Sequence, residues 1–415
     1  MWSDEAVEDA RLERRLGVRD AVGIGLAAMV GAGIFAALSP AAEAAGEALL
    51  VSLALAAAVA YANATSSAHL AMRYPASGGT YVYGRERLGP FWGYLAGWAF
   101  VVGKTASCAA MALTVGAYAW PEHSRAVAVA VVVAVTVVDA LGVQRSSAVA
   151  QVVVGVVLLV LVVVVVVCLA SGSADAGTLR LEGVTAAGVL QGAGLLFFAF
   201  AGFARIATLG EEVRDPVRTL GRAVPLALGI AVVTYAAVAY AALAVLGADG
   251  LAASTDPVAA AVAAAGAPAL VPAVRVTACV AAAGSLLALV LGISRTVLAM
   301  SRDGHLPRTL SAVHPRARVP HHATIGVGAV VAVLAVASDL RGSIGFSSFG
   351  VLVYYAIANA SALTLGADDR RPPPALAWFG LAGCLVLALA LPLASVLMGV
   401  AVLAVGATVY LVRRR

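Results

Sequence analysis

The sequence predicts an all-α protein that crosses a membrane many times. Of its 415 residues, 62% are hydrophobic and only 12% are charged, and the mean hydropathy is +0.97. A water-soluble domain usually has about 25% charged residues, so the composition excludes an ordinary soluble globule. One helix needs roughly 20 apolar residues to cross the hydrocarbon core, and this length allows about twelve such helices joined by short connections.

Apolar runs separated by short polar stretches locate the expected helices. Prolines, glycines and arginines mark most boundaries, because they interrupt apolar helices or stay at the membrane surface. In chain order, the expected spans lie near 20–45, 47–71, 90–119, 125–143, 147–171, 186–210, 222–247, 268–302, 321–339, 343–365, 374–392 and 394–412. Only Pro392 divides the last two, so a re-entrant pair is the alternative there.

The arginines predict which side of the membrane each connection faces. With an even number of spans, twenty arginines fall on the side that holds both termini and four fall on the opposite side. Arginine-rich connections are cytoplasmic, so we expect a multi-pass protein of the cytoplasmic membrane with cytoplasmic segments 1–18 and 413–415. The formal charge of +5 is scattered between apolar runs. This distribution indicates a lipid bilayer and not nucleic acid as the partner, and it leaves the oligomeric state unknown.

Corresponding interruptions occur in the first and sixth spans. The run GIGLAAMVGAGIFAALSP places Gly31 and Gly33 around Ala32 in mid-span, and FFAFAGFARIATLGEE has a second weak point at Ala201 and Gly202. Glycine permits unwinding at membrane depth where the backbone faces protein or a polar cavity. Breaks five spans apart are typical of a five-plus-five inverted repeat with a substrate at the midplane. Close helix packing is the alternative explanation for each glycine.

Four motifs follow one another along the chain. They are GIGLAAMVGAGIF at 23–35, YPASGGTYVYGRERLGPFWGYLAGW at 74–98, FFAFAGFARIATLGEEVRDPVRTLGRAV at 197–224 and SRTVLAMSRDGHLP at 294–307. In this order they resemble the amino acid permeases of the amino acid/polyamine/organocation superfamily. The resemblance implies a LeuT-like fold with inverted repeats 19–171 and 186–365 and two additional helices in 374–412. It also implies movement of an amino acid by alternating access.

A zwitterionic amino acid needs hydrogen-bond donors for its carboxylate and acceptors for its ammonium. The first break offers amides at the N-terminus of an outer half-helix, which favours an anion. Carbonyls at both breaks would accept from the ammonium, and the resemblance gives Phe198 the place of an aromatic gate. The expected substrate-binding residues are Met29, Val30, Gly31, Ala32, Gly33, Ile34, Phe198, Phe200, Ala201, Gly202 and Phe203.

Two ionisable residues within spans are candidates for ion coupling. Lys104, the only lysine, takes the position where several relatives have a substrate-facing tyrosine. It either serves binding and coupling or is a structural lysine held by carbonyls of the broken first span. Proton-coupled relatives often have a lysine in the fifth span, which is absent here. His69, where many relatives have glutamate, either belongs to a proton path or is a satisfied polar residue.

The remaining charges bear on substrate type and gating. Ala204 stands where relatives commonly have Asp or Glu, so a cationic side chain would lack a counter-ion and Lys104 would repel it. We therefore expect neutral amino acids, small or apolar ones foremost. Four charged residues near the inner ends of spans form the expected inner gate, either as scaffolding or through a salt bridge: Arg205, Glu211, Glu212 and Arg295.

Other functions fit the sequence less well. No H-E-x-x-H motif, G-x-S-x-G motif at a useful depth or pair of intramembrane aspartates indicates an enzyme. A channel would need a pore built from repeated short segments. A regulatory permease homologue, an exchanger, an exporter and an amine or polyamine permease remain alternatives. No cofactor or metal is expected, since the four cysteines lie far apart in apolar runs. Protons are the preferred coupling ion. Sodium, which would use hydroxyls such as Ser285, Ser294 and Thr296, is less favoured.

Overall fold

The computed structural model describes residues 16–74, 78–142, 147–172, 184–207, 212–314, 319–366 and 372–413. Within these ranges the regular structure is helical, apart from one isolated parallel bridge between Leu16 and Val213. The α-helices are α2 (Val18–Val30), α3 (Gly33–Ala45), α4 (Leu49–Arg73), α5 (Thr80–Leu88), α6 (Pro90–Ala119), α7 (Ser124–Ala140), α8 (Ser147–Ala170), α9 (Ala186–Phe200), α10 (Ala204–Ala207), α11 (Pro216–Ala253), α12 (Pro257–Ala264), α13 (Val271–Arg302), α14 (His321–Ala337), α15 (Leu340–Leu363), α16 (Pro374–Ala390) and α17 (Leu393–Arg413). Short 3-10 turns are η1 (Gly46–Ala48), η2 (Pro121–His123), η4 (Ala201–Phe203), η5 (Pro268–Leu270) and η6 (Arg308–Ser311).

The described helices fit a polytopic membrane protein. Nine ranges in this part of the chain are long and apolar enough to cross a membrane. One of them, Gly33–Arg73, contains both α3 and α4, which join at Gly46 in a left-handed conformation. Two more apolar helices, α14 and α16, have 17 residues each. The expectation of an all-α membrane protein with many apolar helices is confirmed at this level.

Local sequence signals explain where several helices begin and end. Asp215 begins α11 by accepting a hydrogen bond from the Arg218 amide at 3.1 Å, with Pro216 in the first turn. α11 therefore starts before the expected span at 222. Gly247, with a φ of +66°, interrupts the same helix where the span was expected to end.

Two helices were not expected from the sequence. α5 contains the polar run Gly84 to Arg87, which gives it no apolar periodicity, and α12 has only eight residues. Neither meets the length and hydropathy that identify a spanning helix. α5 nevertheless packs against α6 and α15 and thereby becomes part of one end of the bundle.

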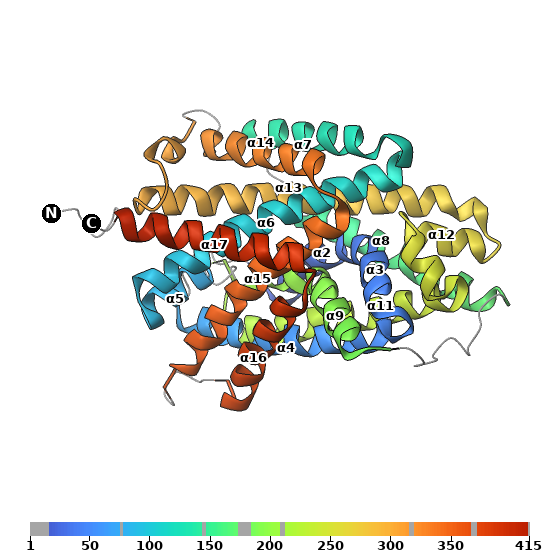
Figure 1. Ribbon diagram of the computed structural model, residues 1–415, viewed down its shortest axis with the longest axis horizontal. Helices are drawn as coiled ribbons and strands as arrows, with labels where there is room; N and C mark the ends of the chain where they lie inside the picture. The colour runs from blue at the N-terminus through green and yellow to red at the C-terminus, as the bar shows by residue number, and fades with distance from the viewer. Residues whose placement is uncertain are drawn as a thin grey trace.

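The centre of the bundle consists of α6 and α15. These two are the most buried of the candidate spans. They approach closely where small residues face each other. A Cβ atom on Gly103 would lie only 3.2 Å from the Gly350 Cα, and the Ser107 and Ser347 hydroxyls are 2.5 Å apart. Figure 1 shows α7 and α14 side by side along one long edge, with α13 next to them. α8 and α17 expose many valines and leucines, as a lipid-facing surface requires.

Candidate functional site

The first interruption lies between α2 and α3. α2 ends at Val30, α3 begins at Gly33, and Gly31 and Ala32 connect them. The six residues that the sequence predicts to line a substrate here, Met29 to Ile34, are all buried. Because the first amides of a helix have no carbonyl of their own helix to bond, the start of α3 presents buried donors.

The second interruption lies between α9 and α10. α9 ends at Phe200, the 3-10 turn η4 covers Ala201 to Phe203, and α10 follows at Ala204. Residues Phe197 to Ala201 are buried, as are Phe203 and Ala204. A 3-10 turn changes the hydrogen-bonding register, so carbonyls at the end of α9 lose their regular helical partners.

The two interruptions pack directly against each other. A Cβ atom on Gly33 would lie 2.5 Å from the Ala199 Cα. One on Gly202 would lie 2.6 Å from the Met29 nitrogen and closer still to the Ala28 carbonyl. Gly31 has an ordinary right-handed backbone, with a φ of −59° and a ψ of −64°. A Cβ atom on Gly31 would collide with the Ser285 side chain, so all three glycines permit close approach, which is the alternative that the sequence offered to unwinding.

Two side chains from other helices reach carbonyls at the breaks. The Tyr235 hydroxyl on α11 lies 2.6 Å from the Met29 oxygen and 3.1 Å from the Ala199 oxygen, so it can donate to either. Ser285 on α13 donates to the Ala27 carbonyl at 3.3 Å. Tyr235 was not predicted from the sequence, where it is one of two tyrosines in an apolar span, with Tyr240. The available signal was that a tyrosine hydroxyl requires a partner when buried.

Lys104 contacts the second break. It lies in α6 with 5% of its surface exposed, and its Nζ donates to the Ala201 carbonyl at 3.2 Å. The structural alternative had placed it against carbonyls of the first broken helix, so the partner differs from the expected one. Among the described residues, no carboxylate forms an ion pair with it.

The predicted phenylalanines do not form one cluster. Phe200 lies against Tyr235, with ring centroids 5.2 Å apart, whereas Phe203 stacks on Tyr355 of α15 at 4.8 Å. Phe198 is 6% exposed. The aromatic residues of the break thus point to different neighbouring helices and fix η4 between α11 and α15.

Arg205 directly follows the second break, whereas His69 lies in another helix, α4. Arg205 in α10 is acted on by the charges of Glu212 and Arg295, which brings three of the four predicted gate residues into electrostatic range. Glu211, the fourth, lies outside the described residues. His69 in α4 has its Nδ1 atom 2.8 Å from the Thr65 carbonyl, one turn earlier in the same helix.

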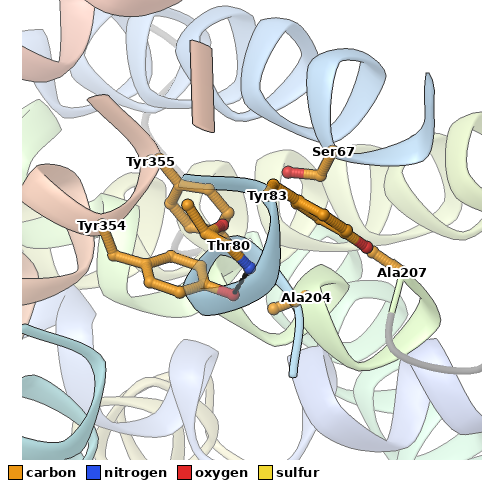
Figure 2. Close-up of a pocket in the computed structure, with 8 residues that line it drawn as sticks. Ser67, Thr80, Tyr83, Ala204, Ala207, Tyr354 and Tyr355 are labelled. Atoms are coloured by element: carbon orange, nitrogen blue, oxygen red, sulfur yellow. Dashed lines mark hydrogen bonds between the residues drawn. The ribbon is translucent and has the colours of Figure 1, made fainter. Parts of the chain in front are cut away.

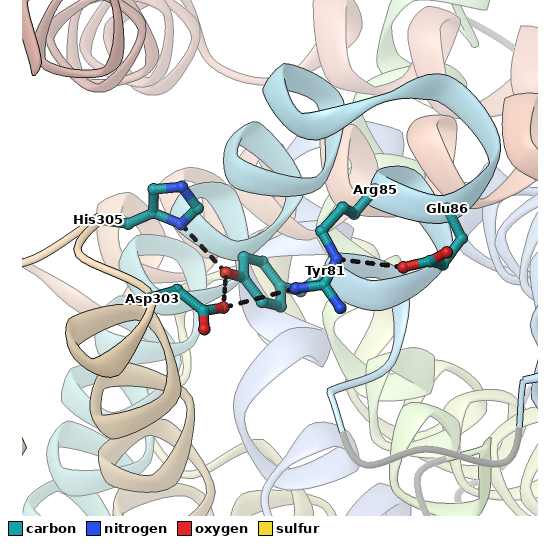
Figure 3. A network of polar contacts seen from close by, with 5 residues as sticks. All are labelled: Tyr81, Arg85, Glu86, Asp303 and His305. Atoms are coloured by element: carbon teal, nitrogen blue, oxygen red, sulfur yellow. Dashed lines mark hydrogen bonds and ion pairs between the residues drawn. The ribbon is translucent and has the colours of Figure 1, made fainter. Parts of the chain in front are cut away.

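A polar network joins α5 to the end of α13 (Figure 3). The Tyr81 hydroxyl donates to Asp303 and lies 3.0 Å from the His305 Nδ1 atom, while Arg85 lies 3.6 Å from Asp303. Burial foremost, and then the hydrogen bond to Asp303 and its charge, raises the pKa of Tyr81. Burial also lowers the pKa of His305, against the opposing charge of Asp303. Both groups are therefore neutral near pH 7, and Asp303 supplies the negative charge opposite Arg85.

A small pocket borders the start of α10 (Figure 2). Ser67 of α4, residues Gly79, Thr80 and Tyr83 around α5, and Tyr354 and Tyr355 of α15 enclose it together with Ala204 and Ala207. The Tyr354 hydroxyl accepts a hydrogen bond from the Thr80 amide at 2.9 Å. The sequence analysis missed this set, because its members come from four segments of the chain.

Comparisons with known proteins place this arrangement among transporters. Residues 16–411 match the model of a family described as amino acid permease. The chain is 65% identical over 405 residues to an uncharacterized transporter of Mycobacterium tuberculosis, covering 97% of this chain and 92% of that protein. It is 27% identical over 406 residues to cationic amino acid transporter 4 of Homo sapiens, covering 89% and 62% of the two chains. A vacuolar cationic amino acid transporter 4 of Arabidopsis thaliana is 28% identical over 391 residues, covering 88% and 64%.

Proposed function

Because this chain belongs to the amino acid permease family, we propose that it carries neutral amino acids, small or apolar ones foremost, across the cytoplasmic membrane by alternating access. Like its family and relatives, it is a transporter and not an enzyme. One observation carries the proposal: two interrupted helices meet inside the bundle, and their break residues are buried except for the partly buried Gly202. Buried half-helix ends are the means by which transporters hold small ions and zwitterions.

The backbone at the breaks supplies the groups that an amino acid needs. In the proposed complex, amides at the start of α3 bind the carboxylate, with the dipole of α3 in support. Carbonyls at the end of α9 accept from the ammonium. Tyr235 and Lys104 already donate hydrogen bonds to carbonyls of this region. Substrate binding therefore requires one of these side chains to give up its hydrogen bond or to share the carbonyl with the substrate ammonium.

Lys104 is the residue that we propose to couple substrate to protons. Its ammonium lies beside Ala201, within the region that the substrate would occupy. We propose that the charged lysine lies closer to the substrate carboxylate than to the substrate ammonium; the carboxylate then favours the charged lysine, and by reciprocity a charged lysine favours the carboxylate. Proton and substrate binding would then reinforce each other, which is the condition for symport.

The proposed topology has twelve spans and two cytoplasmic termini. Counting the α2–α3 and α9–α10 pairs as one span each, the described helices other than α5 and α12 supply twelve. The breaks open the two proposed repeats, 19–171 and 186–365, and 374–412 adds the last two helices. The end of the bundle near Asp303 carries Arg85, Arg87, Arg302 and Arg308, which supports a cytoplasmic position for that end.

Two alternatives have specific observations behind them. Relatives at 27–28% identity are named cationic amino acid transporters, which favours cationic substrates. Against this, the buried charge at the second break is Lys104, and an added cation would be repelled. Sodium coupling is the second alternative: Ser294 and Thr296 donate to carbonyls of their own helix, at 2.7 and 3.1 Å, whereas Ser285 reaches the Ala27 carbonyl of the first span.

Uptake by purified protein in proteoliposomes tests the proposal. A panel of radiolabelled amino acids, including alanine, serine, leucine, arginine, lysine and a polyamine, is offered with and without an inward proton gradient. We expect accumulation of neutral amino acids only with the gradient. Exchange of internal for external amino acid without dependence on the gradient would indicate antiport instead of proton symport. Transport restricted to arginine, lysine or the polyamine would overturn the neutral assignment.

A further inference from the structure

The wall of the pocket beside α10 is mostly apolar, and side chains with hydroxyl groups contribute its small polar part (Figure 2). Its eight lining residues are one serine, one threonine, three tyrosines, two alanines and one glycine, and none of them carries a charge at neutral pH. Such a lining can donate and accept hydrogen bonds but offers no counter-ion. It therefore suits a neutral polar group and disfavours a carboxylate or an ammonium ion.

Three of these hydroxyls lack partners. The side-chain oxygens of Ser67, Tyr83 and Tyr355 are buried and make no hydrogen bond within the described structure. The Tyr355 hydroxyl lies toward the Ala204 amide without reaching hydrogen-bonding geometry. Buried hydroxyls are normally satisfied, and leaving one unpaired costs free energy. Three unpaired hydroxyls from three different helices around one pocket indicate that a guest group completes their hydrogen bonds.

The pocket adjoins the second helix break. Ala204 follows Ala201 by three residues, which is about 6 Å along the 3-10 turn η4. Phe203 of η4 stacks on Tyr355, which itself lines the pocket. A substrate whose ammonium rests on carbonyls of the break therefore has this pocket within about one helical turn of its side chain.

We propose that the pocket binds a neutral hydroxyl group, and that this group is the side-chain hydroxyl of a small amino acid such as serine or threonine. This inference rests on the proposed transport of neutral amino acids and narrows it to a substrate class. The Tyr83 and Ser67 hydroxyls recognise the guest, and Tyr355 closes the pocket from α15. Water has the same hydrogen-bonding chemistry and is the other source of a guest hydroxyl.

Paired substrates distinguish the two sources. Threonine and valine have nearly the same shape and differ in one hydroxyl, and serine differs from alanine by the same group. The initial rate of uptake into proteoliposomes is measured over a range of concentrations to give kcat/KM for each substrate. We expect the intact protein to favour serine over alanine and threonine over valine by about three- to tenfold, the range for one or two net hydrogen bonds.

Tyr83→Phe and Ser67→Ala remove one hydroxyl each. We expect both to reduce the serine-to-alanine and threonine-to-valine ratios toward one while alanine transport is retained. The matched control is Tyr94→Phe, which removes another buried, unpartnered tyrosine hydroxyl that lies outside the pocket. Its ratios should equal those of the intact protein.

Equal kcat/KM values within each pair in the intact protein would overturn the inference and assign the pocket to water. The same conclusion would follow if Tyr83→Phe and Ser67→Ala left the preference unchanged. Absence of transport for all four amino acids by folded protein would instead contradict the proposed function itself. Size-exclusion profiles identify variants that fail to fold, and the retained alanine transport of Ser67→Ala then provides the second test.

Discussion

Lys104 is a buried charge with an incomplete set of hydrogen-bond partners among the described residues. An ammonium group can donate three hydrogen bonds, but the described structure gives this one a single acceptor, the Ala201 carbonyl. Ionisable groups are costly at membrane depth and are retained there chiefly for function. A lysine that uses only one of its three donors within the protein can also bind a substrate carboxylate.

Lys104→Met tests this role with little change in side-chain volume. We expect the variant to lose proton-driven accumulation by at least about tenfold while exchange of internal for external substrate is retained, because exchange needs no net movement of protons. Accumulation and exchange are measured in the same proteoliposomes at several external pH values. Thr105→Ala serves as the control, because this neighbouring hydroxyl donates to Val101 in its own helix. An unchanged pH profile in Lys104→Met would make the lysine a structural residue.

The sequence predicted which residues belong to the candidate site better than it predicted which groups those residues contact. Lys104 and the glycines of both breaks could be chosen because a charge or a flexible residue in an apolar run is conspicuous. Tyr235 could not, since the carbonyls it reaches lie 36 and 206 residues away along the chain. The unpaired hydroxyls of the pocket could not be predicted either, because a serine or tyrosine hydroxyl lacks a partner only when burial separates it from water, and a single sequence does not show burial.

The two interrupted helices are the elements on which the proposed site depends. Each break alone is a short irregularity, but Gly33 and Gly202 bring the backbones of the two helices into direct contact. Each glycine therefore fixes the distance between two half-helices that lie far apart in sequence. The contact surface contains backbone more than side chains, so a repacking of rotamers cannot relieve an added methyl group there.

Gly33→Val is expected to abolish substrate binding and to lower the free energy of unfolding by about 1–3 kcal/mol through overpacking. The Cβ atom would press on the Ala199 backbone, which cannot move without α9. Gly229→Val on α11 introduces the same side chain where no atom lies within 4 Å. Binding is measured by isothermal calorimetry in detergent and stability by thermal unfolding. Normal affinity in Gly33→Val would exclude the break as the carboxylate site.

The helices themselves were largely predictable, and the reason is physical. Long apolar runs such as α6 and α8 have no stable alternative in a bilayer, because every backbone group must be bonded within the segment. α5 and α12 had no such signal, since one is polar and the other is short. Their helical state depends on packing against neighbours, which a single sequence does not contain.

The whole bundle has chemically different ends. At one end the Tyr81 network, Arg302 and Arg413 lie around the turn after α13, where Arg413 donates to the Gly304 carbonyl at 3.0 Å. The opposite end of α13 begins near the ion pair between Arg275 and Asp256. This difference accords with the proposed orientation, in which the arginine-rich end faces the cytoplasm.

Cysteine labelling in intact cells tests that orientation. Glu122→Cys lies in the exposed turn after α6, and Arg302→Cys lies at the end of α13, both with exposed side chains. We expect a membrane-impermeant maleimide to label Glu122→Cys in intact cells and Arg302→Cys only after permeabilisation. The unsubstituted chain, whose cysteines are buried or partly buried, gives the background. The reverse pattern would invert the proposed topology.

The bridge between Leu16 and Val213 has a mechanical consequence. Leu16 lies two residues before α2, Val213 follows α10 in the chain, and two backbone hydrogen bonds of 3.1 Å join these segments. The two broken helices are therefore connected at a second place besides the breaks. We expect these bonds to transmit a tilt of α2 to the segment after α10. Without the bridge, the two segments would move more independently of each other.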